Sequence, residues 1–525
     1  MFKKNRVLIP GILLLFIIPS LMLSQGQKAD SPMKEVTLKE CITNALARNL
    51  DLSIEALNPA IDEASISRSK EKYIPDFSLT YYKQDQNQPG TWGDVEGTSV
   101  MNKYDSYTLS LSERVVTGGT ISLSFSNSST DTTRAFTIIN PSYNSSFRLD
   151  VSQPLLKGFG PKVNRIETLQ AINQRDISLS SLKSRLIQTI YDVEAAYWNL
   201  YSAIENLKVQ ESSLEQSRAI LKKNQEAVRI GTKSVLDILS SEAQVARYED
   251  FLVSARLTVE QNEASLRKIL NLPDDSPVSA QSLIPKDKPV IEKMDISYEE
   301  ALRIALEQRP EIAQTEIELE NNANNISLYR NELLPQLDLT FSTWSPGQSG
   351  IKNIYDTGNP FTGTVIGQIK GSRIEALKEA LKRTYKNWSA NLSLSIPLAN
   401  IFARNSLAKA KIEREQALLR LEKQKQSIAY EVAGAIKELQ NAERKIASSR
   451  ASRDLQEKLL EAEMQKYQLG LGSVEWLLNY QRDLTTAKTS EIQALIGYKL
   501  AVARLERVMG TTLRSKGLKF RDYEF

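Results

Sequence analysis

Apolar residues recur with a heptad spacing along two long stretches that contain no proline, residues 165–230 and 404–469. In the first stretch, steps of four and three residues join these apolar positions: Leu186, Ile190, Val193, Tyr197, Leu200, Ile204 and Leu207. The second stretch repeats the pattern: Ile428, Val432, Ala435, Leu439, Ala442 and Ile446. A mean spacing of 3.5 residues predicts helices packed along a partner helix, as in a coiled coil.

The predicted helices are too long to surround a compact core. At 1.5 Å per residue, each long helix would span roughly 100 Å. Return helices are expected over residues 234–270 and 473–509, each about 55 Å long. Helices of this length indicate a rod, a bundle or a tube.

Shorter segments alternate between apolar and polar residues, which predicts strands. Residues 107–112 and 121–126 alternate on either side of a turn at 117–120, which indicates a hairpin. Residues 146–151 and 390–396 alternate as well. A two-faced pattern suits a water-filled β-barrel in lipid, but taken by itself it is more typical of a half-exposed sheet in a soluble domain. A short helix is expected over residues 372–387.

The chain contains two copies of one unit. Residues 37–80 align with residues 297–340 without a gap, at an offset of 260. Farther along, Gly231 aligns with Gly470 and Leu266 with Leu505, at an offset of 239. Each copy therefore predicts an opening helix that ends near a proline, then strands, a long helix, a glycine turn and a return helix.

The repeat suggests the domain organisation. We expect a first repeat at residues 25–270, a linker at 271–296, a second repeat at 297–510 and a C-terminal tail at 511–525. Residues 1–24 are expected to be a secretory signal peptide, because basic residues precede the apolar run 7–23. The alternative is a single membrane anchor, although Pro10 and Pro19 interrupt a run that is short for a span.

The composition argues against catalysis. The chain has no histidine and one cysteine, Cys41, so the commonest general base and metal ligand are missing. We expect no catalytic residues, no cofactor and no metal site. A carboxylate-based enzyme is the weaker alternative, because the acidic residues are scattered over helix faces. With 67 basic and 63 acidic residues, the charge balance gives no support for nucleic-acid binding.

In their repeated order, these features resemble the TolC-like outer-membrane efflux family. Similar segments lie in the opening helices, after the first strands and at the turns: residues 45–50, 305–310, 153–160, 229–237 and 468–475. The resemblance implies a mostly α-helical fold with a β-barrel part. Three copies would share one barrel in outer-membrane lipid, and their helices would form a periplasmic tube. That tube would meet a periplasmic adaptor (membrane fusion) protein on an inner-membrane pump.

Two points stay open at this stage. If each copy contributes two strands, a trimer has twelve; if the hairpin at 117–120 joins the wall, it has eighteen. A periplasmic or surface coiled-coil structural protein without a pore would explain the heptads equally well. It would not explain why strands are inserted at the same place in both copies.

The resemblance also implies where adaptor contacts lie. They would be at the two turns between long and return helices: Gly231, Thr232, Lys233, Ser234, Gly470, Leu471, Gly472 and Ser473. Glycine suits these positions because it enters the left-handed conformation that ends a helix. The alternative is that both segments are plain hairpin turns with no partner.

A pore constriction is expected just inside the tip. Family members often carry acidic residues six or nine positions after the turn glycine. This chain has Asp237 at plus six in the first copy, whereas the second copy has Asn479 at plus nine and Glu475 at plus five. All three residues are constriction candidates. The alternative for Asp237 is a solvated residue in the first turn of a helix, where the helix dipole favours it.

Overall fold

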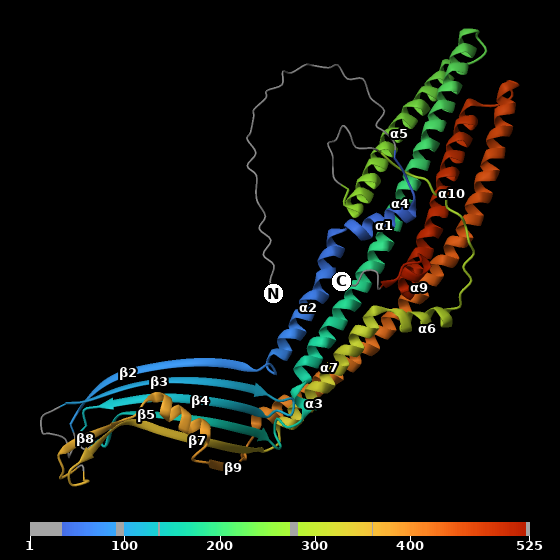
Figure 1. Cartoon of the computed structure of the whole chain (residues 1–525). Coiled ribbons are helices and arrows are strands. Elements are labelled where there is room, and N and C mark those ends of the chain that lie inside the picture. Colours follow the sequence, from blue (N-terminus) through green and yellow to red (C-terminus); the bar gives the residue numbers. More distant parts are fainter. Residues whose placement is uncertain (1–33, 91–98, 135–136, 273–281, 360, 521–525) are drawn as a thin grey trace, which may run out of the picture.

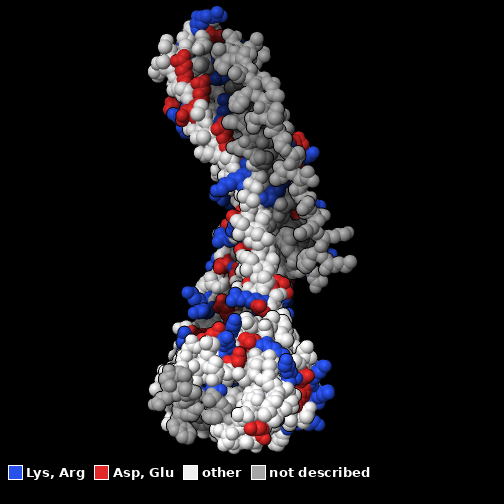
Figure 2. All heavy atoms as spheres, turned by 60° about the vertical axis from the view of Figure 1, so that its left-hand side comes forward, with Lys and Arg blue, Asp and Glu red and all other residues white. Residues whose placement is uncertain are grey.

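The computed structural model describes residues 34–90, 99–134, 137–272, 282–359 and 361–520. The expected signal peptide at 1–24 lies outside the described residues. Figure 1 shows an elongated shaft of helices with a β-sheet at one end and two hairpin tips at the other. No helix among the described residues is long and apolar enough to cross a membrane. In Figure 2, residues of both charges are interspersed along the shaft.

The four predicted long helices are confirmed. The first copy contains α4 (Ile166–Arg229) and α5 (Val235–Leu270), and the second contains α9 (Ile401–Gln468) and α10 (Val474–Met509). The heptad seam lies in the core, because Leu186, Ile190, Val193, Tyr197 and Leu200 of α4 are completely buried. In α9, Ile428, Val432 and Ala435 are completely buried as well. The 3.5-residue spacing therefore marks the packed face of both long helices.

The opening helix of each copy is divided in two, which the sequence pattern did not predict. The pieces are α1 (Leu38–Arg48), α2 (Leu50–Glu71), α6 (Tyr298–Gln308) and α7 (Pro310–Glu332). The breaks fall at Asn49 and Arg309, which both have extended backbones. Arg309 precedes a proline, which disfavours the helical conformation. Asn49 accepts a hydrogen bond from the Leu52 amide at 3.0 Å and donates one to the Ile269 carbonyl at 3.1 Å.

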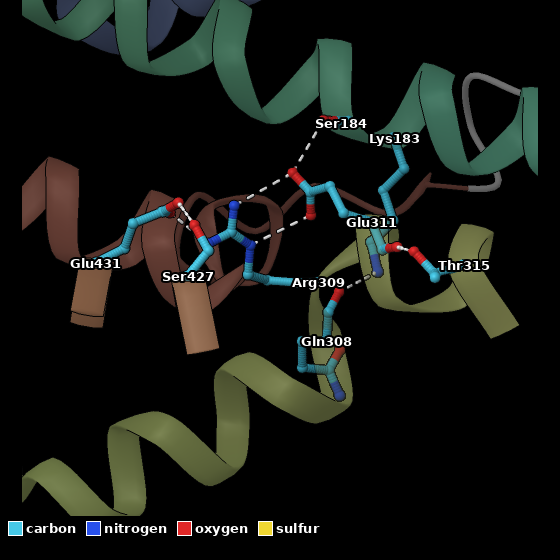
Figure 3. A network of polar contacts seen from close by, with 8 residues as sticks. All are labelled: Lys183, Ser184, Gln308, Arg309, Glu311, Thr315, Ser427 and Glu431. Atoms are coloured by element: carbon cyan, nitrogen blue, oxygen red, sulfur yellow. Dashed lines mark hydrogen bonds and ion pairs between the residues drawn. The ribbon is translucent and has the colours of Figure 1, made fainter. Parts of the chain in front are cut away.

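The second break also joins the two copies through a polar network, drawn in Figure 3. Arg309 lies between two carboxylates, 2.6 Å from Glu431 of α9 and 3.2 Å from Glu311 of α7. Lys183 of α4 donates a hydrogen bond to the Gln308 carbonyl at 3.0 Å. Burial alone would raise the pKa of Glu311, but the hydrogen bonds from Arg309 outweigh it and hold that pKa below its ordinary value.

Seven of the described strands form one antiparallel sheet. Its main strands, in spatial order, are β2 (Asp76–Pro89), β3 (Ser99–Arg114), β4 (Thr120–Thr132), β5 (Ile139–Pro154), β7 (Gln336–Tyr355) and β9 (Asn387–Ser395). The short β8 (Val365–Lys370) pairs with the outer part of β7. The predicted hairpin is confirmed as β3–β4, and it lies inside the sheet between β2 and β5. The first copy thus supplies four main strands and the second copy two.

The predicted helix within 372–387 is shorter than expected. It is α8 (Arg373–Lys382), and it ends because Arg383 adopts a left-handed conformation with φ of 54°. Two short helices, α3 (Pro161–Asn164) and α11 (Thr512–Ser515), and the parallel pair β1 (Lys34–Val36) and β6 (Leu283–Pro285) complete the fold.

The start of the expected C-terminal tail is part of the folded shaft. Leu513 of α11 belongs to the first copy's hydrophobic core, and Leu518 packs against that core. Lys516 lies 2.5 Å from Glu194 of α4 and 3.3 Å from Glu506 of α10. Glu194 is almost fully buried, so this ion pair fixes α11 against both copies.

The alternation of the strands produces a sheet with two chemically different faces. Paired residues of one face, here called the apolar face, include Phe77, Leu79, Leu109, Leu111, Leu123, Phe125, Phe147, Leu149, Phe341, Leu392 and Leu394. The opposite, polar face includes Ser78, Thr80, Thr108, Ser110, Ser122, Ser124, Arg148, Asp150, Ser342, Asn391 and Ser393. Many of the apolar side chains are exposed in the single chain, for example Phe77 at 66%.

Candidate functional site at the hairpin tips

Both long helices end in the same backbone motif, which creates the two tips at the far end of the shaft. Gly231 and Gly470 have φ values of 78° and 77°. The Gly231 and Thr232 amides donate to the Val228 and Ala227 carbonyls at 2.9 and 3.0 Å. Gly470 and Leu471 make the equivalent bonds to Tyr467 and Lys466, at 3.2 and 3.0 Å. This Schellman pattern satisfies the last carbonyls of a helix and requires a left-handed residue, which glycine supplies without strain.

The return helices begin with serine caps. Ser234 accepts a hydrogen bond from the Leu236 amide at 3.2 Å, and the Asp237 carboxylate accepts one from the Ser234 amide at 3.2 Å. Ser473 accepts from the Glu475 amide at 3.2 Å. Asp237 and Glu475 therefore lie in the first turns of α5 and α10, where the helix dipole stabilises negative charge. The Asp237 carboxylate bonds to Ser234, and among the described residues no hydrogen bond or ion pair joins it to Glu475 or Asn479.

The expected tip residues are exposed or half-buried, as a contact surface requires, but the two tips are not equivalent. Val235 and Leu239 of the first tip are 63% and 57% exposed. Their counterparts Val474 and Leu478 are 4% and 8% exposed, because they pack in a cluster with Ile220 of α4. The first tip therefore presents apolar side chains on the side that the second copy does not cover.

A polar cluster that the sequence did not predict links the two tips. The Lys233 ammonium lies over the Tyr467 ring, 3.2 Å from its centre. The Tyr467 hydroxyl donates to the Asn224 side-chain oxygen, and the Asn224 amide donates to the Ser241 hydroxyl at 2.7 Å. Burial lowers the pKa of Lys233 and raises the pKa of Tyr467. The cluster thus fixes α4 and α5 against α9 close to the turn.

A signal for this cluster existed in the comparison of the two copies. Lys233 occupies the position equivalent to Gly472, and Tyr467 the position equivalent to Val228. A Cβ atom on Gly472 would lie 2.8 Å from the Tyr467 backbone nitrogen, so the second tip has no room for a side chain there. The first copy thus has a lysine where the second has a glycine, and the second copy has a tyrosine where the first has a valine. These two differences lie against each other in the structure.

Comparison with known proteins identifies the family. The sequence profile of the family described as outer membrane efflux protein matches residues 118–272 and 301–511. The chain belongs to this family. Its members are outer-membrane channels with a large periplasmic helical part. The sheet end of this chain therefore lies in the outer membrane, and its helical shaft lies in the periplasm. The predicted resemblance is thereby confirmed.

Solved structures show the same fold at low sequence identity. A membrane protein from Pseudomonas aeruginosa is 17% identical with a TM-score of 0.64, and the match covers 90% of each chain. The CmeC outer membrane channel from Campylobacter jejuni is 15% identical with a TM-score of 0.64, over 90% of this chain and 86% of that chain. The outer membrane protein VceC from Vibrio cholerae is 13% identical with a TM-score of 0.63, over 90% and 96%. No curated protein sequence matches.

Proposed function

We propose that the chain is the outer-membrane channel subunit of a tripartite efflux or type I secretion system and acts as a homotrimer. Substrates would pass from an inner-membrane pump and its periplasmic adaptor through the helical tube to the outside. The channel would catalyse no reaction. One observation supports the homotrimer: apolar surface is exposed on one copy of the repeat where the equivalent surface of the other copy is buried.

The contact between the two copies within one chain shows which kind of helix would cover this exposed surface. Helix α7 of the second copy packs along α4 of the first. Gln314 donates to Ser181 at 2.9 Å, and Asn173 donates to Asn321 at 2.8 Å. In the duplication, α2 is the counterpart of α7 and α9 is the counterpart of α4, so α2 would be expected to pack along α9. The α2 and α9 helices of one chain, however, lie on opposite sides of the shaft (Figure 1). Each therefore needs a second chain.

Helix α2 carries the complementary stripe. Leu50, Ile54, Leu57 and Ile61 follow steps of four, three and four residues and are each 61–63% exposed. Ile54 and Ile61 occupy the positions equivalent to Gln314 and Asn321, the α7 residues that contact α4. An apolar heptad stripe of this kind is stable in water only when another helix covers it.

Helix α9 carries a matching surface at the other side of the chain. Ile412 and Leu419 are 62% and 64% exposed, and Ile412 is equivalent to Asn173 of α4. The return helices repeat the pattern, since Leu257 of α5 is 52% exposed whereas its counterpart Ile496 is 3% exposed. A ring in which α2 and α5 of one chain cover α9 of the next buries both surfaces. Closed cyclic symmetry achieves this without leaving free ends.

We assign the tips to adaptor contact and Asp237 to the constriction, with Glu475 and Asn479 as further constriction candidates. Both tips lie at the end of the shaft farthest from the sheet (Figure 1), which is the periplasmic end. No side chain shields the backbone at the two left-handed glycines. No neighbouring atom of the structure lies within 4 Å of the position that a Cβ of Gly231 or Gly470 would occupy. An incoming helical hairpin could therefore approach the backbone closely.

The test of the proposed function is conductance. The protein, extracted gently in detergent and purified, is added to planar lipid bilayers, with vesicle leakage of a small dye as a second measurement. We expect discrete, salt-dependent channel steps and an oligomer on native gels. A stable, folded oligomer that gives neither conductance nor leakage would support the structural coiled-coil alternative. A monomer that is the main folded species would disprove the trimer.

A further inference from the structure

The additional hairpin β3–β4 is a full member of the sheet. β3 pairs with β2 from Asp76↔Ser112 to Pro89↔Ser99, and β4 pairs with β5 from Thr120↔Ser152 to Thr130↔Ser142. The apolar face continues across the hairpin through Leu109, Leu111, Leu123 and Phe125, and the polar face through serines and threonines. The hairpin therefore has the same two-faced chemistry as the strands beside it.

The apolar residues form a band that crosses the strands at a slant. On β2 the band is centred on Leu79, and on β9 it is centred on Leu392. Through the pairing registers, the row of Leu79 and Leu109 continues to Phe125, Phe147 and Ser345. On β7 the band is centred six residues earlier, on Leu339, the partner of Leu392.

The slant gives the tilt of the strands relative to the membrane. Six residues correspond to about 20 Å along a strand, and five strand spacings correspond to about 24 Å across the sheet. A band that lies level in lipid then requires strands tilted by about 40°, within the range of roughly 35–45° typical of membrane barrels. The hairpin strands β3 and β4 lie between the two ends of this band and carry its apolar residues, so the hairpin belongs to the wall.

The two edges of the sheet match each other. β2 leads away from α2 and β9 leads back toward α9, so the strands run antiparallel (Figure 1). The nine residues of β9, Asn387–Ser395, can lie opposite Gln84–Asp76 of β2, with Leu392 beside Leu79. Both edges are exposed, with Leu79 and Leu392 each at 63%. In this register the apolar face and the polar face each continue from one edge to the other.

One chain cannot close these edges on itself. A barrel of about eight strands already has an interior that side chains fill completely, and six strands would leave less room. The polar face carries Arg148 and Asp150, an ion pair at 2.9 Å, together with many hydroxyl groups. Closing six strands around these groups would remove them from water, which is costly for charged and polar side chains.

We propose that three chains, pairing β2 of one with β9 of the next, close a single barrel of eighteen strands. This inference rests on the homotrimer of the proposed function and adds the strand number and the register. Barrels of sixteen to eighteen strands leave an aqueous channel, and their diameter grows roughly in proportion to strand number. The lumen would be lined by Ser, Thr and Asn side chains. Such a lining suits a wide channel that passes hydrated substrates with low selectivity.

Helix α8 does not obstruct this lumen. The helix packs on the side of the sheet to which a Gly347 side chain would point, since a Cβ on Gly347 would collide with the Ala376 carbonyl. Gly347 shares its side of the sheet with Ser145, Asn127 and Tyr107, two residues beyond the apolar row of Leu109. Arg373 of α8 pairs with Asp105 and lies over the Tyr107 ring. The helix therefore covers the outer surface of the wall beyond the lipid band.

The first test probes the register at the junction between chains. In a Cys41→Ala background, the pair Thr80→Cys with Asn391→Cys places both thiols on the polar face at opposed positions of β2 and β9. Mild oxidation should give covalent dimers and trimers on non-reducing gels. The control pair, Thr80→Cys with Ser393→Cys, is displaced by two residues and diagonal, about 7–8 Å apart, which is too far for a disulfide. Crosslinking of the control pair in preference to the opposed pair would overturn the register.

The second test asks whether the hairpin lines the pore. Ser124→Cys on β4 lies on the polar face, and Leu123→Cys lies on the apolar face. A charged, membrane-impermeant thiol reagent should reduce conductance in up to three steps, one for each chain, in Ser124→Cys channels only. Unchanged conductance after complete labelling of Ser124→Cys would place the hairpin outside the wall and leave twelve strands. If the Cys41→Ala parent shows no conductance, the channel proposal fails instead.

Discussion

The carboxylate of Asp237 is engaged within its own helix and is also the acidic constriction candidate nearest the first turn. In the proposed threefold ring, three such carboxylates would converge on one axis and attract cations. Asp237→Asn keeps a side chain of the same size in the first turn. We expect a lower cation preference and weaker block by multivalent cations, measured as reversal potential and block in planar bilayers. Glu475→Gln is the matched comparison. If only Glu475→Gln changes selectivity, the second tip forms the constriction.

Gly231 and Gly470 offer a test of adaptor contact that leaves the turn intact. Asparagine tolerates the left-handed conformation, so Gly231→Asn and Gly470→Asn add a side chain at the tip with little backbone strain. We expect export by cells to fall at least several-fold while oligomers form normally on native gels. Gly358→Asn is the control, because Gly358 also has a positive φ of 69° and open space around it, but lies in the loop between β7 and β8. Full export by both tip variants would remove the tips from the contact surface.

At the scale of single residues, the sequence predicted what local chemistry determines and missed what tertiary contacts determine. The turn glycines follow from backbone rules and end both long helices as expected. The cluster of Lys233, Tyr467 and Asn224 joins residues more than 200 positions apart. No periodicity within one helix could have placed a lysine over that ring.

At the scale of helices and strands, the hydrophobic pattern predicted the long helices to within three residues of their ends. Heptad spacing is a strong signal because it repeats from Leu186 to Leu207 in α4 and from Ile428 to Ile446 in α9. The breaks at Asn49 and Arg309 were missed because the apolar periodicity continues through them. In the second copy the X-Pro pair at Arg309 and Pro310 was a usable signal, whereas in the first copy the break depends on the contact between Asn49 and Ile269.

The docking of α11 can be tested through its ion pair. Lys516→Met leaves the Glu194 carboxylate buried without its cation, which we expect to cost about 3–5 kcal/mol of unfolding free energy at neutral pH. Burial raises the pKa of Glu194, and loss of Lys516 raises it further. Because the folded state then takes up a proton more readily than the unfolded chain, the deficit should shrink as pH falls toward about 5. Thermal unfolding in detergent at both pH values measures this.

The matched control for that experiment is the double variant Glu194→Gln with Lys516→Met. It lacks the Glu194 carboxylate, so its unfolding temperature relative to the parent should change much less between the two pH values. A Lys516→Met deficit that is independent of pH would mean that α11 contributes through packing of Leu513 alone.

At the scale of the whole molecule, the duplication predicted more than any single motif. It fixed the order of elements in the second half from the first. It could not predict the strand number, because the hairpin β3–β4 has no counterpart among the main strands of the second copy. It also could not show that the sheet is continuous, since pairing between β5 and β7 joins residues about 200 positions apart.

The duplication also makes the helical contact between chains testable residue by residue. Asn173 and Asn321 touch at 2.8 Å within one chain, and their equivalents are Ile412 and Ile61. In a Cys41→Ala background, Ile61→Cys with Ile412→Cys should therefore form covalent dimers and trimers on oxidation or with a short thiol crosslinker. The control Ile54→Cys with Ile412→Cys is displaced by one heptad, about 10 Å along the helix, beyond the reach of a disulfide. If both pairs crosslink equally, the contact has no fixed register. If neither does while Thr80→Cys and Asn391→Cys form trimers, the sheets associate as proposed but α2 does not cover α9 of the neighbour.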